Sequence, residues 1–194
     1  YLVMVAFGDA GPFTLLTVCF AWLPTFYHTE YGMSLAKTGF LMGLVSLGGF
    51  VSLILASLLS ARIPKRRPFL IIPGITCGFA GLAVIVLGDS VSMYLAIAML
   101  GFGCWFYLPI IVTIPMELYP DDPRRVSLIF ACIMAITSLC NFAGPPTVGV
   151  LADLTGSLIP GLVVFAVIAW SLAIAGILLP ETGVRVSETG RTRG

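Results

Sequence analysis

Six long stretches without a single charged side chain dominate this sequence of 194 residues. They are residues 10–29, 38–61, 68–88, 90–116, 126–152 and 154–180, and none of them contains Asp, Glu, Lys or Arg. A bilayer hydrocarbon core about 30 Å thick is crossed by roughly 20 apolar helical residues. Each stretch is long enough, so the pattern predicts six membrane spans.

Composition supports a membrane fold over a soluble one. The chain is 59% hydrophobic and only 10% charged, whereas an ordinary soluble domain has about 25% charged residues. A soluble fold of this size could not bury so much apolar surface. Because no stretch alternates polar and apolar residues as a barrel strand does, we expect helices, and hence an all-α polytopic membrane protein.

The first span can reach back to Tyr1, with Asp9 as an interruption. The chain begins without Met or a basic segment, so we interpret its start as internal to a longer protein and not as a signal peptide. The polar residues 181–194 are expected to be a disordered cytoplasmic tail. The predicted spans of the six-helix bundle, residues 1–180, are about 1–27, 38–61, 68–88, 90–116, 126–152 and 157–180.

Positive charge is concentrated on one side of these spans. The opposite side has only Lys37. By the positive-inside rule, the basic loops and the C-terminus are expected in the cytoplasm. The nine residues on the basic side are Arg62, Lys65, Arg66, Arg67, Arg124, Arg125, Arg185, Arg191 and Arg193.

The layout also indicates an internal repeat. The first and fourth spans, which begin the two groups of three spans, both carry proline. A three-plus-three inverted repeat is therefore expected.

Asp9 is the acid that falls within a predicted span. An ionisable group in the hydrocarbon layer is costly unless it faces a cavity, which favours a role in proton coupling or substrate contact. The alternative is that the helix starts near Pro12 and Asp9 caps it at the membrane surface.

Other side chains in the spans could line a pathway through the bundle. Asn141 is the strongest of these candidates because a buried amide must find hydrogen-bonding partners. The alternative is that it only joins two helices. The other candidates for the substrate or proton pathway are Thr14, Thr17, Trp105, Tyr107 and Thr137.

Two cytoplasmic loops carry candidate gating residues. Arg62 or Arg66 could pair with an acid or a helix C-terminus, or could serve only to keep its loop in the cytoplasm. Glu117 lies near a helix C-terminus, where the helix dipole disfavours it, so pairing with Arg124 or Arg125 would relieve the conflict. In the same loop, Asp121 or Asp122 is expected to cap the next helix, which starts with Pro123.

The remaining signals argue against an enzyme. The single histidine, His28, lies in an external loop, and no phosphate-binding loop or nucleophile with a nearby base occurs. All five cysteines fall inside predicted spans, where a thiol behaves as a small apolar residue. We expect no cofactor, no metal and no nucleic-acid partner.

Several segments resemble the C-terminal six helices of the major facilitator superfamily. The basic loop departs from that superfamily's Asp-Arg-x-Gly-Arg pattern because it lacks the acid and the glycine. Within the superfamily, the Trp-Leu-Pro and Asp-Leu-Thr-Gly-Ser segments are most similar to the branch of cyanate and nitroimidazole transporters. The matching segments are residues 21–25 with 31–34, residues 61–67, residues 116–120 with Arg124, residues 144–157, and Leu-Pro-Glu-Thr-Gly at 179–183.

The resemblance implies a twelve-helix secondary transporter that works by alternating access around a site shared between two halves. This chain would supply the C-terminal half, with a small solute, the bilayer and the missing N-terminal half as partners. The expected location is a plasma or inner membrane, and the expected driving force is a proton gradient. Two alternatives stay open: a half-size unit that dimerises, and a membrane scaffold or receptor that transports nothing.

Overall fold

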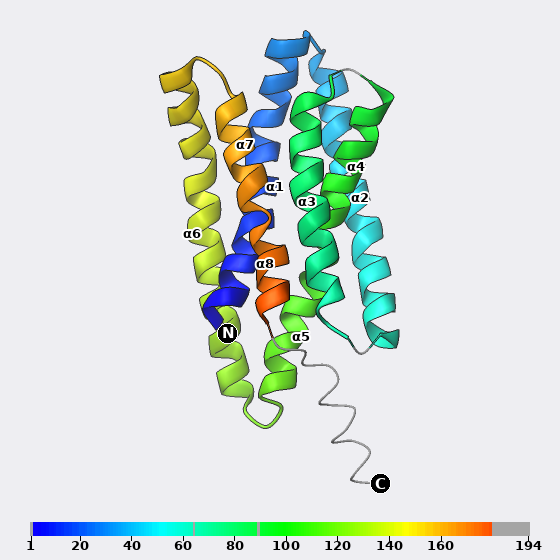
Figure 1. Cartoon of the computed structure of the whole chain (residues 1–194), viewed down its shortest axis with the longest axis vertical. Helices are drawn as coiled ribbons and strands as arrows, with labels where there is room; N and C mark the ends of the chain where they lie inside the picture. Colours follow the sequence, from blue (N-terminus) through cyan, green and yellow to red (C-terminus); the bar gives the residue numbers. More distant parts are fainter. Residues whose placement is uncertain (1, 64, 89, 180–194) are drawn as a thin grey trace.

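The described residues are all helical apart from short connections. The computed structural model describes residues 2–63, 65–88 and 90–179, and no strand occurs in these ranges. Six helical stretches are long and apolar enough to cross a membrane, which confirms the all-α, six-span prediction. The tail predicted at residues 181–194 lies outside the described residues. The helices are α1 (Leu2–Tyr31), α2 (Leu35–Arg62), α3 (Pro68–Val86), α4 (Val91–Phe106), α5 (Leu108–Leu118), α6 (Pro123–Thr155), α7 (Ile159–Ile168) and α8 (Ser171–Leu178) (Figure 1).

The fourth and sixth spans are each made of two helices in succession. α4 gives way to α5 at Tyr107, where Pro109 lacks the N–H that would bond the carbonyl of Trp105 four residues before. α7 gives way to α8 where the N–H of Trp170 bonds the carbonyl of Val167, three residues back, in a tighter turn. The sequence analysis predicted continuous spans at both places.

The helices pack as an up-and-down bundle (Figure 1). α1 contacts α6, α7 and α8, whereas α2 packs mainly against α4, and α3 packs against α4, α7 and α8. α1 and α6 run in the same direction, since both begin at the lower end of the bundle and end at the upper end (Figure 1).

The close contact between α2 and α4 depends on two glycines. A Cβ atom on Gly101 of α4 would clash with the backbone of Val45, and one on Gly48 of α2 would clash with the carbonyl of Ala98. Small residues at such crossings let two membrane helices approach backbone to backbone. This pair is therefore held by van der Waals contact along its length.

Helix ends follow local signals in the sequence. The side chain of Asp122 accepts a hydrogen bond from the N–H of Arg125, 3.0 Å away, and thereby caps α6, which confirms one of the two predicted caps. α6 ends at Gly156, which adopts the left-handed conformation (φ 73°) that glycine tolerates best.

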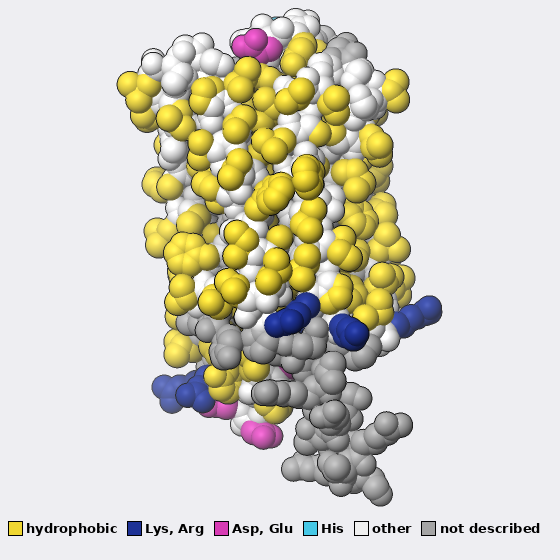
Figure 2. Space-filling model, in the orientation of Figure 1, with side chains coloured by type: hydrophobic (Ala, Val, Ile, Leu, Met, Phe, Trp, Pro, Cys, Tyr) yellow, Lys and Arg dark blue, Asp and Glu magenta, His cyan; other side chains and the backbone are white. Residues whose placement is uncertain are grey.

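Large hydrophobic side chains cover much of the outside of the bundle. Figure 2 shows a broad band of hydrophobic side chains across the visible face, with Lys and Arg at its lower end. Large side chains such as Phe142 on α6 and Phe50 on α2 are exposed. In water this surface would aggregate, whereas in a bilayer it faces lipid or another membrane segment. The chain is therefore an integral membrane protein.

Candidate functional site

Asp9 lies inside the bundle and not at its surface. It belongs to the interior of α1, which begins at Leu2, and its side chain is only 1% exposed. The alternative in which the helix starts near Pro12 and Asp9 serves as a surface cap is therefore wrong. A carboxyl group in this position needs hydrogen-bonding partners from neighbouring helices.

Two hydroxyl groups from other helices supply those partners. Thr137 of α6 donates to Oδ2 of Asp9 at 2.6 Å, and Tyr107 donates to Oδ1 at 3.0 Å. All three residues are buried, and Tyr107 is the residue at which α4 gives way to α5. The break in the fourth span thus places the phenol against α1. Asp9, Tyr107 and Thr137 are called the carboxyl cluster below.

The carboxyl cluster lies inside the membrane-spanning region, away from both ends of α6. Thr137 comes 14 residues after Pro123 and 18 residues before Thr155, the two ends of α6. At 1.5 Å per residue these separations correspond to about 21 Å and about 27 Å. The cluster is therefore deep in the bundle.

The chemistry of the carboxyl cluster differs from that of an ion pair. The two side chains that donate to Asp9, Tyr107 and Thr137, are neutral hydroxyl groups, and their distances are those of ordinary to strong O–H···O hydrogen bonds. A hydroxyl group can rotate to accept a hydrogen bond as well as donate one. The cluster can therefore hold Asp9 either ionised or protonated without breaking a contact with a fixed cation.

An aromatic pair lies one turn further along α1. Phe13 follows Asp9 by four residues, which puts both on the same side of the helix. Its ring meets that of Trp105 edge to face, with 5.8 Å between the centroids, and Trp105 in turn lies against Gly49 of α2. Phe13 was not among the sequence-derived candidates, although its spacing from Asp9 could have identified it. Thr17, the next residue on this side, donates to the carbonyl of Phe13 within its own helix.

Thr14 and Asn141 form a second polar contact between α1 and α6. The hydroxyl of buried Thr14 donates to Oδ1 of Asn141 at 3.1 Å. Further toward the upper end, the indole N–H of Trp22 donates to the carbonyl of Pro145 at 2.9 Å. α1 and α6 are thus joined at three successive heights, counting the bond between Asp9 and Thr137.

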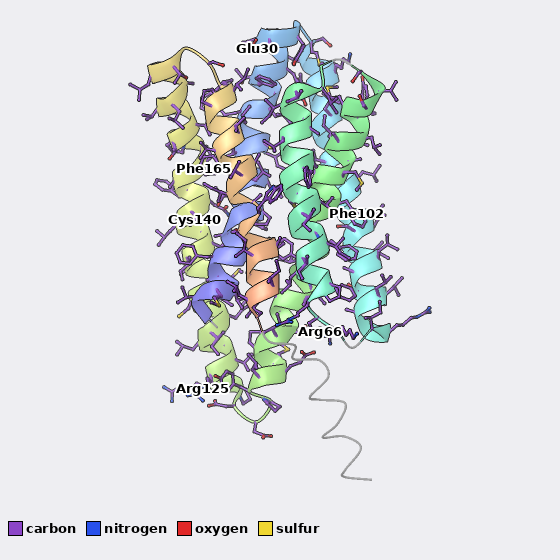
Figure 3. The ribbon with its side chains drawn as sticks, in the orientation of Figure 1. Glu30, Arg66, Phe102, Arg125, Cys140 and Phe165 are labelled. Carbon is purple, nitrogen blue, oxygen red and sulfur yellow. The ribbon has the colours of Figure 1, made fainter. Side chains whose placement is uncertain are left out.

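An ion pair lies at the lower end of the bundle, far along α5 from Tyr107. Arg66, in the connection between α2 and α3, donates to Oε1 of Glu117 from Nε at 3.0 Å and from Nη2 at 2.6 Å. It also donates from Nη1 to the carbonyl of Ser60 at 3.0 Å. Figure 3 labels Arg66 at this end. Glu117 lies near the C-terminus of α5, where the helix dipole disfavours a negative charge, and the cation beside it offsets that cost.

The structure also describes the other basic candidates, Arg62, Arg124 and Arg125. The guanidinium group of Arg125 lies over the ring of Tyr119, 4.7 Å from its centroid, a cation–π contact. Arg62 and Arg124 are exposed. Glu117 was expected to pair with Arg124 or Arg125, and Arg62 or Arg66 with an acid or a helix C-terminus; the structure pairs Arg66 with Glu117.

Metal-binding groups are sparse in the described ranges. No three His, Cys, Asp or Glu side chains converge there in a way that could hold a metal ion. Cys77 and Cys104 have sulfur atoms 3.4 Å apart in the buried core, but two thiols are fewer than the four ligands of a structural zinc site.

Comparison with known proteins points to one family. The sequence profile described as "Major Facilitator Superfamily" matches residues 2–145. The chain is also similar to a protein named "Putative tartrate transporter" from Agrobacterium vitis, with 28% identity over 190 residues. That alignment covers 97% of this chain but 40% of the relative, so the chain spans less than half of the relative's length.

Proposed function

The chain belongs to the major facilitator superfamily, and on that premise we propose that it is the C-terminal half of a proton-coupled secondary transporter. Membership of this family supports a transporter of small solutes and not an enzyme. Alternating access between two halves is the expected mechanism, and the 40% share of the relative's length supports the existence of a further half. The twelve-helix arrangement, the proton coupling and the pathway residues are all parts of the proposal.

The single observation that carries the proposal is the buried carboxyl cluster. Asp9 is held by the hydroxyl groups of Tyr107 and Thr137, from two other spans, and both of its oxygens have a donor. A carboxyl group deep in a membrane protein is costly and is retained mainly where protons or substrates pass. We propose that Asp9 takes up a proton when the site faces one side of the membrane and releases it when the site faces the other.

The ion pair between Arg66 and Glu117 is proposed as the cytoplasmic gate. It joins the connection between α2 and α3 to the end of α5, the lower half of the broken fourth span. Because Tyr107 immediately precedes α5, a change at Asp9 could reach this gate through that one helix. Breaking the ion pair would free α5 and the loop to separate as access alternates.

The substrate class is proposed to be a small hydroxylated organic acid. The name of the relative from Agrobacterium vitis supports this class. Among the described residues, no Lys or Arg lies in the middle of a span, so the cation that pairs with an organic anion would come from the other half. Half-size dimerisation and a scaffold role remain the alternatives. Transport by the protein that carries this chain would exclude the scaffold role, and the number of copies of the chain in the transporting unit tests half-size dimerisation.

The test uses that protein reconstituted in proteoliposomes, with labelled tartrate as the probe. Asp9→Asn removes the proton-accepting group and keeps the size of the side chain. We expect accumulation driven by an inward proton gradient to fall at least about tenfold, equivalent to about 1.4 kcal/mol. Exchange of labelled for unlabelled tartrate without a gradient should stay within about twofold of wild type.

The matched control is Asp153→Asn, which changes an exposed aspartate at the end of α6 and should alter neither measurement. Normal accumulation by the Asp9→Asn protein would contradict the proposal that Asp9 couples proton movement to transport. If wild-type vesicles take up no tartrate, the substrate class is wrong. The same comparison is then made with the solute that most raises the melting temperature of the purified protein.

A further inference from the structure

An apolar groove runs along the outside of α1 where it meets α6, α7 and α8. It consists of two adjoining cavities of about 270 Å³ and about 220 Å³ that share Phe7 and Ser171 in their walls. Figure 3 labels two residues of its deep end, Cys140 of α6 and Phe165 of α7. The rest of the wall is mostly aliphatic and includes Val3, Met4, Ala10, Ile168, Ile174, Ala175 and Leu178.

The length of the groove corresponds to one leaflet of a bilayer. On α1 it extends from Val3 to Thr14, which are 11 residues apart, so it is about 16 Å long at 1.5 Å per residue. Half of a hydrocarbon core about 30 Å thick is about 15 Å. A single acyl chain extended from one membrane surface would therefore reach the deep end of the groove.

The groove offers little to a polar solute. Three hydroxyl groups lie in its walls, and each already donates to another protein group. Thr14 donates to Asn141, Thr147 to the carbonyl of Ala143, and Ser171 to the carbonyl of Phe7. The occupant that suits these walls is a hydrocarbon chain.

Positive charge lies at the lower end of the groove. Leu178 lines that end, and the carbonyl of the next residue, Leu179, accepts a hydrogen bond from Nε of Arg67 at 2.7 Å. Lys65 and Arg66 precede Arg67 in the same connection. In Figure 2 the visible Lys and Arg side chains lie where the hydrophobic band ends, at the depth of a lipid headgroup.

We propose that this groove binds one anionic phospholipid from the leaflet on the basic side. Its acyl chain lies between α1 and α8, and its phosphate lies beside Arg67. A guanidinium group presents several donors in a plane and suits a phosphate. An anionic headgroup is favoured over a zwitterionic one because it brings no ammonium group to oppose Lys65 and Arg67. This site is separate from the carboxyl cluster and does not depend on the proposed transport function.

The test is lipid titration of the purified full chain in detergent, read by native mass spectrometry. Dioleoylphosphatidylglycerol is compared with dioleoylphosphatidylcholine, which has the same acyl chains and a neutral headgroup. We expect one tightly bound phosphatidylglycerol and about tenfold weaker binding of phosphatidylcholine. Equal binding of the two lipids to the wild-type chain would overturn the proposal and leave the groove as a place for bulk lipid tails.

Two pairs of variants separate the contribution of the lipid headgroup to binding from that of the acyl chain. Arg67→Gln should abolish the preference for phosphatidylglycerol, whereas Arg62→Gln, at an exposed arginine at the end of α2, should keep it. Ala143→Phe, which fills the groove from an exposed position on α6, should weaken both lipids at least fivefold, and Ala135→Phe, outside the groove on the same helix, should weaken neither. Each variant is first checked for an unchanged melting temperature. Equal effects within either pair would also contradict the proposal.

Discussion

Two carboxyl groups, Asp9 and Glu117, are held in opposite ways. Asp9 lies in the interior of the bundle, 1% exposed, and the hydroxyl groups of Tyr107 and Thr137 donate to it. Glu117 lies at the lower end with its side chain 15% exposed and pairs with the guanidinium group of Arg66. Both positions disfavour a bare negative charge, the first through burial and the second through the helix dipole.

The difference shows what each arrangement can do. An ion pair stabilises the charged form of its carboxylate and is either made or broken, which suits a contact that separates during a conformational change. Hydroxyl partners tolerate both forms of a carboxyl group, which suits a group that changes its protonation in place. The inner site therefore fits the proposed change of protonation, and the outer one fits the proposed gate.

Removing both hydroxyl groups from the carboxyl cluster is expected to have the largest effect on stability. Tyr107→Phe combined with Thr137→Val leaves Asp9 buried without either donor. We expect the free energy of unfolding to fall by about 2–4 kcal/mol, because each unsatisfied buried polar group costs about 1–3 kcal/mol. Denaturant unfolding in mixed micelles measures it.

The control for that experiment is Thr113→Val on α5, whose hydroxyl bonds only the carbonyl of Ile110 in its own helix. Introducing Asp9→Leu first should reduce the cost of the double change to less than about 1 kcal/mol, since the acceptor is then gone. An equal cost with and without Asp9 would mean that the two hydroxyl groups act independently of the carboxyl group.

Breaking the ion pair is expected to have a smaller effect. A double-mutant cycle with Arg66→Gln and Glu117→Gln should give a coupling energy of about 1–2 kcal/mol, in the range of hydrogen bonds to charged groups. Arg62→Gln, at an exposed arginine in the same region, should change stability by less than about 0.5 kcal/mol. A coupling energy near zero would show that the contact is too weak to act as a gate. The contrast between an ion-paired Glu117 and a hydroxyl-bound Asp9 would then no longer hold.

Single cysteine substitutions, which are expected to affect stability least, test on which side of the membrane the ion pair lies. A cysteine placed at exposed Glu30 should react with a membrane-impermeant maleimide in intact cells, whereas one placed at exposed Lys65 should react only after lysis. Both substitutions are expected to leave stability unchanged within about 0.5 kcal/mol. The opposite labelling pattern would put the Arg66–Glu117 contact outside and reverse the proposed direction of the gate.

Most of the fold could be predicted because the bilayer imposes it. A lipid core requires long uncharged helices, and the six charge-free stretches satisfy that requirement. The two broken spans could not be predicted equally well. Pro109 was a visible signal for the break at Tyr107, whereas the break before Trp170 has neither proline nor glycine beside it. That second break depends on packing against other helices, which no local pattern records.

The candidate site could be predicted as a set of residues but not as a set of contacts. Asp9, Tyr107 and Thr137 are all recognisable as polar groups in apolar spans, yet their mutual contacts join positions 98 and 128 residues apart. The sequence analysis considered the arginines nearest to Glu117 in sequence, and the structure adds Arg66, which is 51 residues away. Helix packing decides which distant spans lie side by side. A single sequence does not show that packing, so these contacts could not be predicted from it.

The three hydrogen bonds between α1 and α6 have a mechanical consequence. They join the parallel helices at Asp9, Thr14 and Trp22, at successive heights. A slide of one helical turn, about 5.4 Å, would break all three at once, whereas tilting the two helices together breaks none. α1 and α6 should therefore move together as one rigid unit. A movement of α1 at Asp9 should then move α6 with it as far as Trp22.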